Sequence, residues 1–187
     1  MTSLAWAATA RCFLNAAALC LGVASAAQAA TWQPAGFVDG ARVQHTASQL
    51  PDGRVLVTGG NDGGSTANAT TRLYDPVTGN WANGPDLLGG ARANHTATSL
   101  LDGAVLIAGG YRGGIYPSQA LTFDTRSGHF SPAGALTDVR RQHTATLLPD
   151  GRVLVVGGGY APASAELYDS AADQWSAAPS LAQGRWS

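Results

Sequence analysis

At 187 residues the chain is long enough for one domain with a sizeable core. Charged residues make up 12% of the sequence and the net charge is −1, which argues against a nucleic-acid partner and against a polybasic membrane-surface protein. A high glycine content, 24 residues, combined with few charges is typical of short strands joined by tight turns.

The first thirty residues have the layout of a secretory signal. Arg11 precedes an apolar run over residues 13–23, and small residues with an Ala-x-Ala ending follow. The run is shorter than the ~18 residues of a membrane-spanning helix and Asn15 interrupts it, so a permanent anchor is the less favoured alternative. We expect a signal peptide over 1–29, cleaved at its end or, as a second choice, after Ala26. The protein is then exported to the periplasm, cell surface or extracellular space without a stable membrane anchor.

Both cysteines of the chain, Cys12 and Cys20, lie inside this signal. The mature protein therefore contains none. This excludes disulfides, thiolate metal sites and cysteine nucleophiles from the rest of the chain.

Beyond the signal the sequence repeats three times. Each unit begins with an Arg-x-x-His-Thr-Ala segment, followed by an Asp-Gly turn, an apolar Val-Leu-Val or Val-Leu-Ile segment and a pair of glycines. Two aromatic residues seven positions apart end each unit. The histidines are His45, His95 and His143, which are 50 and 48 positions apart. The units cover about 38–86, 87–135 and 136–180, and residues 181–187 begin a fourth.

Each unit predicts a four-stranded antiparallel sheet. The Asp-Gly turn folds the His-Thr-Ala strand back onto the apolar second strand, which is predicted to be covered on both faces. We expect the glycine pair after it to adopt positive φ where the next sheet approaches closely. An aspartate after the first aromatic residue makes the turn between the third and fourth strands. The second aromatic residue is expected to be a buried plug between sheets; these residues are Trp81, Phe130 and Trp175.

The residues of this repeat resemble the kelch-repeat β-propeller family, whose motif positions are Arg-x-x-His, the glycine pair, and Tyr and Trp seven apart. The resemblance covers essentially all of residues 32–187 and implies a partial propeller domain over 30–187. It is greatest to exported bacterial kelch-repeat proteins; the propeller of galactose oxidase-like proteins is similar. Phe123 and Phe130 replace Tyr and Trp in the middle unit. The resemblance implies an all-β, kelch-type β-propeller of about three four-stranded blades.

The ends of the chain predict an incomplete ring. Trp32 lies 10 residues before Arg42, as the last aromatic residue of each unit lies 10 or 11 before the next arginine, so we expect an N-terminal fourth (d) strand before the first unit. Propellers usually have ~4–8 blades, which favours a fragment of a longer propeller. Self-association into a ring and a poorly folding remnant are the alternatives.

Two groups of residues are candidates for ligand binding. Arginine side chains near one mouth of the central channel grip acidic peptides or small anions in some similar kelch domains; here they are Arg42, Arg92 and Arg140. The alternative is a structural role, in which each arginine pairs with loop carbonyls. The loops between the second and third strands vary from unit to unit, and specificity usually resides in such loops. Their contact-capable side chains are Tyr111, Arg112, Tyr116 and Tyr160.

The repeated histidines invite a ring of metal ligands, but no Asp or Glu lies at ligand spacing beside them, which favours structural imidazoles hydrogen-bonded within their own blades. No phosphate-binding loop, nucleophile elbow or unexplained carboxylate pair is present. We therefore predict no catalytic residue, no cofactor, no metal and no enzymatic activity.

The sequence favours an exported binding or scaffold module whose loop face contacts a protein, a peptide or a glycan. The alternative is part of a carbohydrate-active kelch enzyme, either similar to sialic-acid mutarotases or similar to galactose oxidase with its copper site outside this segment. A purely structural part of a larger surface protein is a third possibility.

Overall fold

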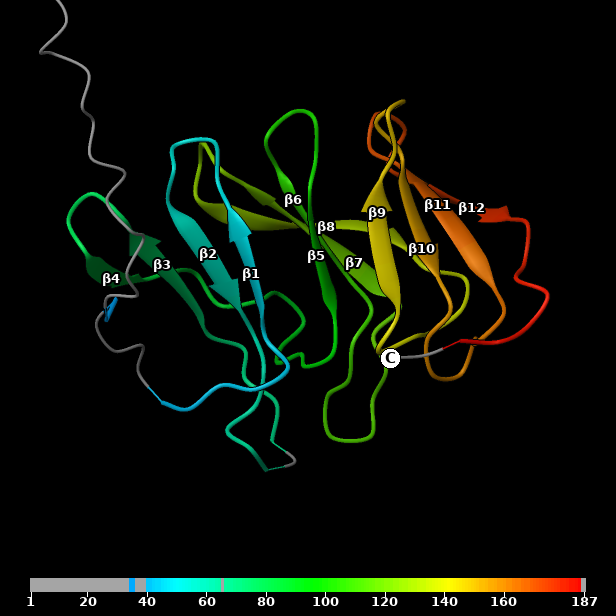
Figure 1. Cartoon of the computed structure of the whole chain (residues 1–187), viewed down its shortest axis with the longest axis horizontal. Helices are drawn as coiled ribbons and strands as arrows, with labels where there is room; N and C mark the ends of the chain where they lie inside the picture. The colour runs from blue at the N-terminus through cyan, green and yellow to red at the C-terminus, as the bar shows by residue number, and fades with distance from the viewer. Residues whose placement is uncertain (1–33, 36–39, 65, 186–187) are drawn as a thin grey trace, which may run out of the picture. The chain divides into compact units, whose positions relative to one another are not determined.

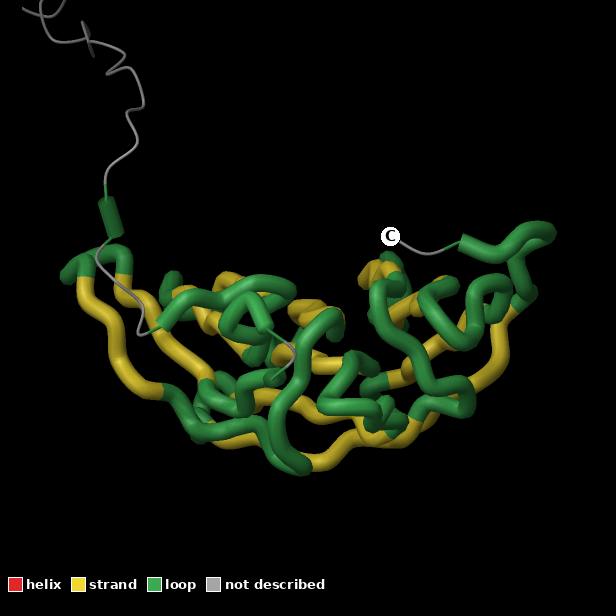
Figure 2. Tube along the Cα trace, turned by 90° about the horizontal axis from the view of Figure 1, so that it is seen from below, coloured by secondary structure: helices red, strands yellow, loops and turns green. Residues whose placement is uncertain are grey.

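The computed structural model describes residues 34–35, 40–64 and 66–185. The chain divides into two compact units, Met1–Pro34 and Ala35–Ser187. The expected signal peptide and Trp32 lie outside the described residues, as does the end of the expected fourth repeat. Every regular element in the described part of the second unit is a strand (Figures 1 and 2). No helix there is long and apolar enough to cross a membrane.

The strands of the described residues form three four-stranded antiparallel sheets, which we call blades 1, 2 and 3. Blade 1 consists of β1 (Thr46–Gln49), β2 (Val55–Thr58), β3 (Thr71–Asp75) and β4 (Asn80–Asn83). Blade 2 consists of β5 (Thr96–Ser99), β6 (Val105–Ala108), β7 (Gln119–Asp124) and β8 (His129–Ala135). Blade 3 consists of β9 (Thr144–Leu147), β10 (Val153–Val156), β11 (Ala165–Asp169) and β12 (Gln174–Ala178). This confirms the predicted order of four strands per repeat.

The blades follow one another with equivalent strands as neighbours. The first strands β1, β5 and β9 lie side by side, and β8 lies beside β12 (Figure 1). Because each blade is a simple antiparallel meander, its two tight turns share one end and the loop between its second and third strands lies at the other. We call these the turn end and the loop end.

The hydrophobic core lies between the blades. One cluster joins blades 1 and 2 through Leu50, Leu56, Leu87, Val105, Ile107, Leu121, Phe123 and Phe130. A second joins blades 2 and 3 through Leu100, Leu106, Ala120, Ala133, Val153, Val155 and Tyr168. Strand β6 contributes to both clusters and is buried along its whole length, as its uninterrupted apolar sequence predicts.

The two aromatic residues of each repeat are cross-strand partners, with ring centroids 5.0–5.1 Å apart. The prediction that the second aromatic is the buried plug holds for Phe130 but is wrong for Trp81 and Trp175, which are only half-buried. Their indole Nε1 groups instead donate at the outer edge, Trp175 to the carbonyl of Gly134 and Trp81 to that of Ala35. In blade 3 the first aromatic, Tyr168, is the buried member of the pair.

The glycine pairs have the predicted positive φ at the predicted close approach between blades. Gly109 and Gly110 have φ of +62° and +109°, and the N–H of Gly110 donates to the carbonyl of Arg140 in the next blade over 2.9 Å. The pairs of blades 1 and 3 do the same with the carbonyls of Arg92 and Arg185. A side chain is excluded here because a Cβ on Gly109 would lie 2.5 Å from that carbonyl oxygen.

We expect Gly109→Ala to lower the free energy of unfolding by at least ~2 kcal/mol, because strain at positive φ and a clash between blades add together. Gly63→Ala is the matched control: its φ is +93°, but a Cβ there meets nothing within 4 Å, so only the strain of ~1 kcal/mol applies. Urea unfolding followed by circular dichroism measures both. Equal losses for the two variants would show that the close approach contributes nothing.

Candidate functional site

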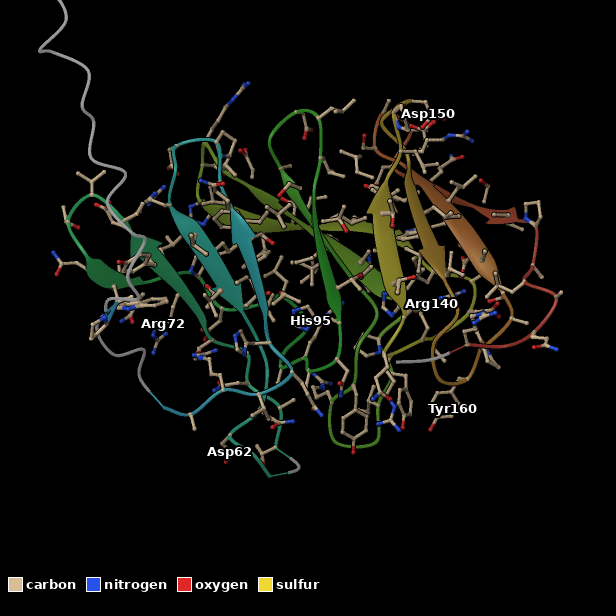
Figure 3. All side chains as sticks on the ribbon, viewed as in Figure 1. Asp62, Arg72, His95, Arg140, Asp150 and Tyr160 are labelled. Atoms are coloured by element: carbon tan, nitrogen blue, oxygen red, sulfur yellow. The ribbon has the colours of Figure 1, made fainter. Side chains whose placement is uncertain are left out.

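Three tyrosines from two blades meet at the loop end. Tyr111 and Tyr116 belong to the loop after β6. Tyr160, which is labelled in Figure 3, belongs to the loop after β10. The ring of Tyr116 lies between the other two, with centroids 5.4 Å from Tyr111 and 4.3 Å from Tyr160. The hydroxyl of Tyr160 donates to that of Tyr116 over 2.7 Å. The loops thus present one aromatic surface built from both blades.

Arg141 joins this surface, although it is not among the candidates predicted from the sequence. Its Cζ lies 5.2 Å from the ring centroid of Tyr111 and 5.7 Å from that of Tyr116, within the range of a cation–π interaction. Arg141 follows the repeated Arg140 and occupies a variable position of the motif. The only sequence signal was its departure from the repeat, since Val43 and Ala93 stand at the equivalent positions. We call Tyr111, Tyr116, Tyr160 and Arg141 the Tyr–Arg cluster.

The backbone of Tyr160 is held in a conformation that non-glycine residues rarely adopt. Its φ is +76°, and its side chain is 64% exposed, so burial does not compensate for the strain. Strained residues of this kind are concentrated at binding and active sites. In Tyr160 the conformation brings the exposed ring against Tyr116.

Arg112, the remaining loop candidate, lies apart from this cluster. Its guanidinium donates to the carbonyl of Gly89 in the segment between blades 1 and 2. Together with Leu88, Ile115 and Pro117 it lines a cavity of about 350 Å³. The structure therefore divides the four loop candidates between two places.

The side chains of the three repeated arginines form hydrogen bonds within their own blades. Arg92 and Arg140 are 2% and 0% exposed, and each donates to the carbonyl of the first glycine of its own blade's pair, Gly109 and Gly157. Burial lowers the pKa of Arg92 to about 10. The half-buried Arg42 makes the equivalent bond to Gly59 over 2.9 Å. These are the loop-carbonyl contacts that the structural alternative describes.

Arg140 also forms a buried ion pair, which Arg92 does not form with any described residue. Its Nη2 lies 2.7 Å from Oε1 of Glu166, which is itself only 2% exposed. The carboxylate of Glu166 further accepts the backbone N–H groups of Thr137 and Asp138 at 2.8 and 3.2 Å. Glu166 thereby ties β11 to the chain segment that leads into blade 3.

Two of the repeated histidines, His95 and His143, form hydrogen bonds to another blade, so the expectation that they bond within their own blades is wrong for these two. Nε2 of His95 in blade 2 lies 2.9 Å from the hydroxyls of both Thr46 and Thr58 in blade 1. Nε2 of His143 in blade 3 likewise lies 2.9 Å from the hydroxyl of Thr96 in blade 2. Each ring therefore links its blade to the preceding one.

The residue before each histidine has positive φ. Gln44, Asn94 and Gln142 have φ between 53° and 57°. The N–H of Asn94 donates to the carbonyl of Gln44, and that of Gln142 to the carbonyl of Asn94, each over 3.1 Å. With the histidines they surround a polar cavity of about 340 Å³. The sequence motif does not reveal these residues, because their residue types differ between repeats while their backbone conformation is the same.

No family model and no curated protein matches this chain. Among solved structures it is similar to a fungal alcohol oxidase of the AA5 family in complex with copper, with 19% identity and a TM-score of 0.59 over 72% of this chain and 30% of that chain. It is also similar to YjhT, with 12% identity and a TM-score of 0.64 over 78% of this chain and 54% of that chain. The chain thus spans less than two thirds of either protein.

At these identities the likeness shows the fold alone. The expectation that the chain is not an enzyme gains no support, since one of the similar proteins is an oxidase. The described residues do not fit a copper site, because no group of three or more His, Cys, Asp or Glu side chains among them is placed to hold a metal. The blades and these two likenesses together show that the chain has the fold of a kelch-like β-propeller, whose ring the three described blades do not close.

Proposed function

We propose that this chain is an exported binding module that holds a glycan, a peptide or a protein on its loop end. The observation that carries the proposal is the Tyr–Arg cluster. Tyrosine offers a large, rigid contact area at little cost in conformational entropy, and together with Arg it is enriched at the residues that dominate binding energies. In this cluster Tyr160 is exposed and its backbone is strained.

The export part of the proposal rests on the layout of residues 1–29 and is tested separately. We expect the secreted protein to begin at residue 30 or, as the second choice, at residue 27. N-terminal sequencing of protein recovered from the periplasm or the medium measures this. Full-length protein retained in the cell contradicts it.

Binding is tested by probing arrays of immobilised glycans and of peptides with the purified chain. We expect Tyr116→Ala to weaken every specific interaction at least ~tenfold, because the central ring of the cluster is lost. Val77→Ala is the control: Val77 is 92% exposed and lies in the turn between β3 and β4, at the turn end. Identical array profiles for the two variants would refute a binding role of the loop end.

A second candidate function is part of a carbohydrate-active enzyme, and the structural likeness to the alcohol oxidase supports it. In the oxidase form the copper ligands must come from outside the described residues. Hydrogen peroxide release from galactose after incubation with copper tests the oxidase form, and the rate at which sugar anomers interconvert tests the mutarotase form. Turnover in either assay would favour the enzyme over the passive binder.

A further inference from the structure

The fold does not require the positive charge of Arg141. The equivalent residues of blades 1 and 2, Val43 and Ala93, form the same isolated backbone bridge that Arg141 forms with Gly159. Blade 2 makes this bridge with no more than a methyl side chain. The charge in blade 3 is therefore a local addition to a position that the repeat leaves free.

No carboxylate neutralises this charge within the described residues. No ion pair and no hydrogen bond of the Arg141 guanidinium occurs there, in contrast to the adjacent Arg140 with its partner Glu166. The aspartates of the tight turns, such as Asp102 and Asp150, lie at the turn end (Figure 3 labels Asp150 opposite Tyr160). A half-buried guanidinium without a counter-charge is a strong and specific partner for an anion, to which it can donate in bidentate fashion.

The surroundings of Arg141 favour an anion carried on a ring. Tyr111 and Tyr116 lie against its guanidinium, and the ring of Tyr160 lies 4.3 Å from that of Tyr116 at an angle of 53°. A six-membered ring can pack one face against such an angled pair of aromatic rings. The cluster contains one cation, which matches one carboxylate, whereas an acidic peptide would call for several.

We propose that the Tyr–Arg cluster binds a single carboxylate carried on a six-membered ring, with the carboxylate on the guanidinium of Arg141 and the ring face on Tyr116 and Tyr160. This rests on the proposed binding function of the loop end and specifies its ligand. Such a group occurs in aromatic acids and in uronic acids, which share this chemistry.

The test uses two matched pairs of probes on the purified chain, measured by isothermal titration calorimetry. The pairs are 4-hydroxybenzoate with 4-hydroxybenzamide, and methyl β-glucuronide with methyl β-glucoside. We expect the acid of one pair to bind at least ~tenfold more tightly than its neutral partner, and the pair that shows this preference identifies the source of the ring. Arg141→Ala should abolish the preference while the protein still folds cooperatively in urea unfolding, because alanine already stands at this position in blade 2.

Arg152→Ala is the charge-matched control, because Arg152 pairs with Asp150 at the turn end. This variant should leave the preference for the acid intact. The proposal is overturned if neither acid binds, if acid and neutral probes bind alike, if Arg141→Ala keeps the preference, or if a polyglutamate peptide binds more tightly than both ring acids. Array binding that depends on Tyr116 but not on Arg141 would overturn this inference alone and leave the binding function standing. Array profiles indifferent to both residues would remove the binding function as well.

Discussion

Arg140→Leu is expected to lower the free energy of unfolding by about 3–5 kcal/mol, because it leaves the buried carboxylate of Glu166 without its counter-charge. The guanidinium of Arg140 is fully buried and lies 2.7 Å from that carboxylate, and it also bonds to the carbonyls of Gly157 and Ser164. The two backbone N–H groups that remain on Glu166 do not supply a full charge. Urea unfolding followed by circular dichroism measures the loss.

Two variants make this result specific. Arg152→Leu removes an arginine of the same repeat from an exposed ion pair with Asp150, and exposed pairs contribute only ~0–1 kcal/mol. Combining Arg140→Leu with Glu166→Leu should recover part of the loss, because the equivalent of Glu166 in blade 2 is the buried Leu121. If Arg140→Leu costs no more than Arg152→Leu, the buried ion pair does not stabilise blade 3.

Acidification from pH 6.5 to 4.5 is expected to destabilise the protein by ~1.4 kcal/mol per pH unit for each buried inter-blade histidine. Burial, reinforced by the charge of Arg92, lowers the pKa of His95 to about 3, and burial with the charge of Arg140 lowers that of His143 to about 4. In the unfolded chain both have a pKa near ~6.5. Below that pH both histidines are protonated in the unfolded state but remain neutral in the folded state. The stabilisation is therefore complete above pH 6.5 and is lost as the pH falls towards 4 and 3.

The free energy of unfolding measured at half-unit intervals of pH gives this slope directly. His143→Gln should reduce it by about half, because one of the two depressed histidines is removed while an amide can still reach the hydroxyl of Thr96. The range stops at pH 4.5 because aspartates with lowered pKa, such as Asp75 and Asp124, lose their own contribution below their ordinary value of 3.8. An unchanged slope in His143→Gln would mean that this histidine is protonated in the folded state.

The sequence by itself determined the strands, the turns and the contact between blades at the glycine pairs. Turn geometry is a local property: the carboxylates of Asp52 and Asp75 accept the N–H of the residue two positions later, as Asx turns require. A glycine pair at the end of an apolar strand likewise signals positive φ with close backbone approach, and Gly109 has both. Threefold repetition of these local signals is what made the propeller fold predictable.

Only the tertiary structure decided which side chains meet across blades. His95 lies 49 positions from Thr46, and Tyr160 lies 44 positions from Tyr116, so neither pair belongs to one repeat unit. The stacking of blades sets such contacts, and a motif that describes one blade carries no information on them. Arg141 is the clearest example. Its position varies between repeats, and its cation–π contacts are made with two tyrosines of the neighbouring blade.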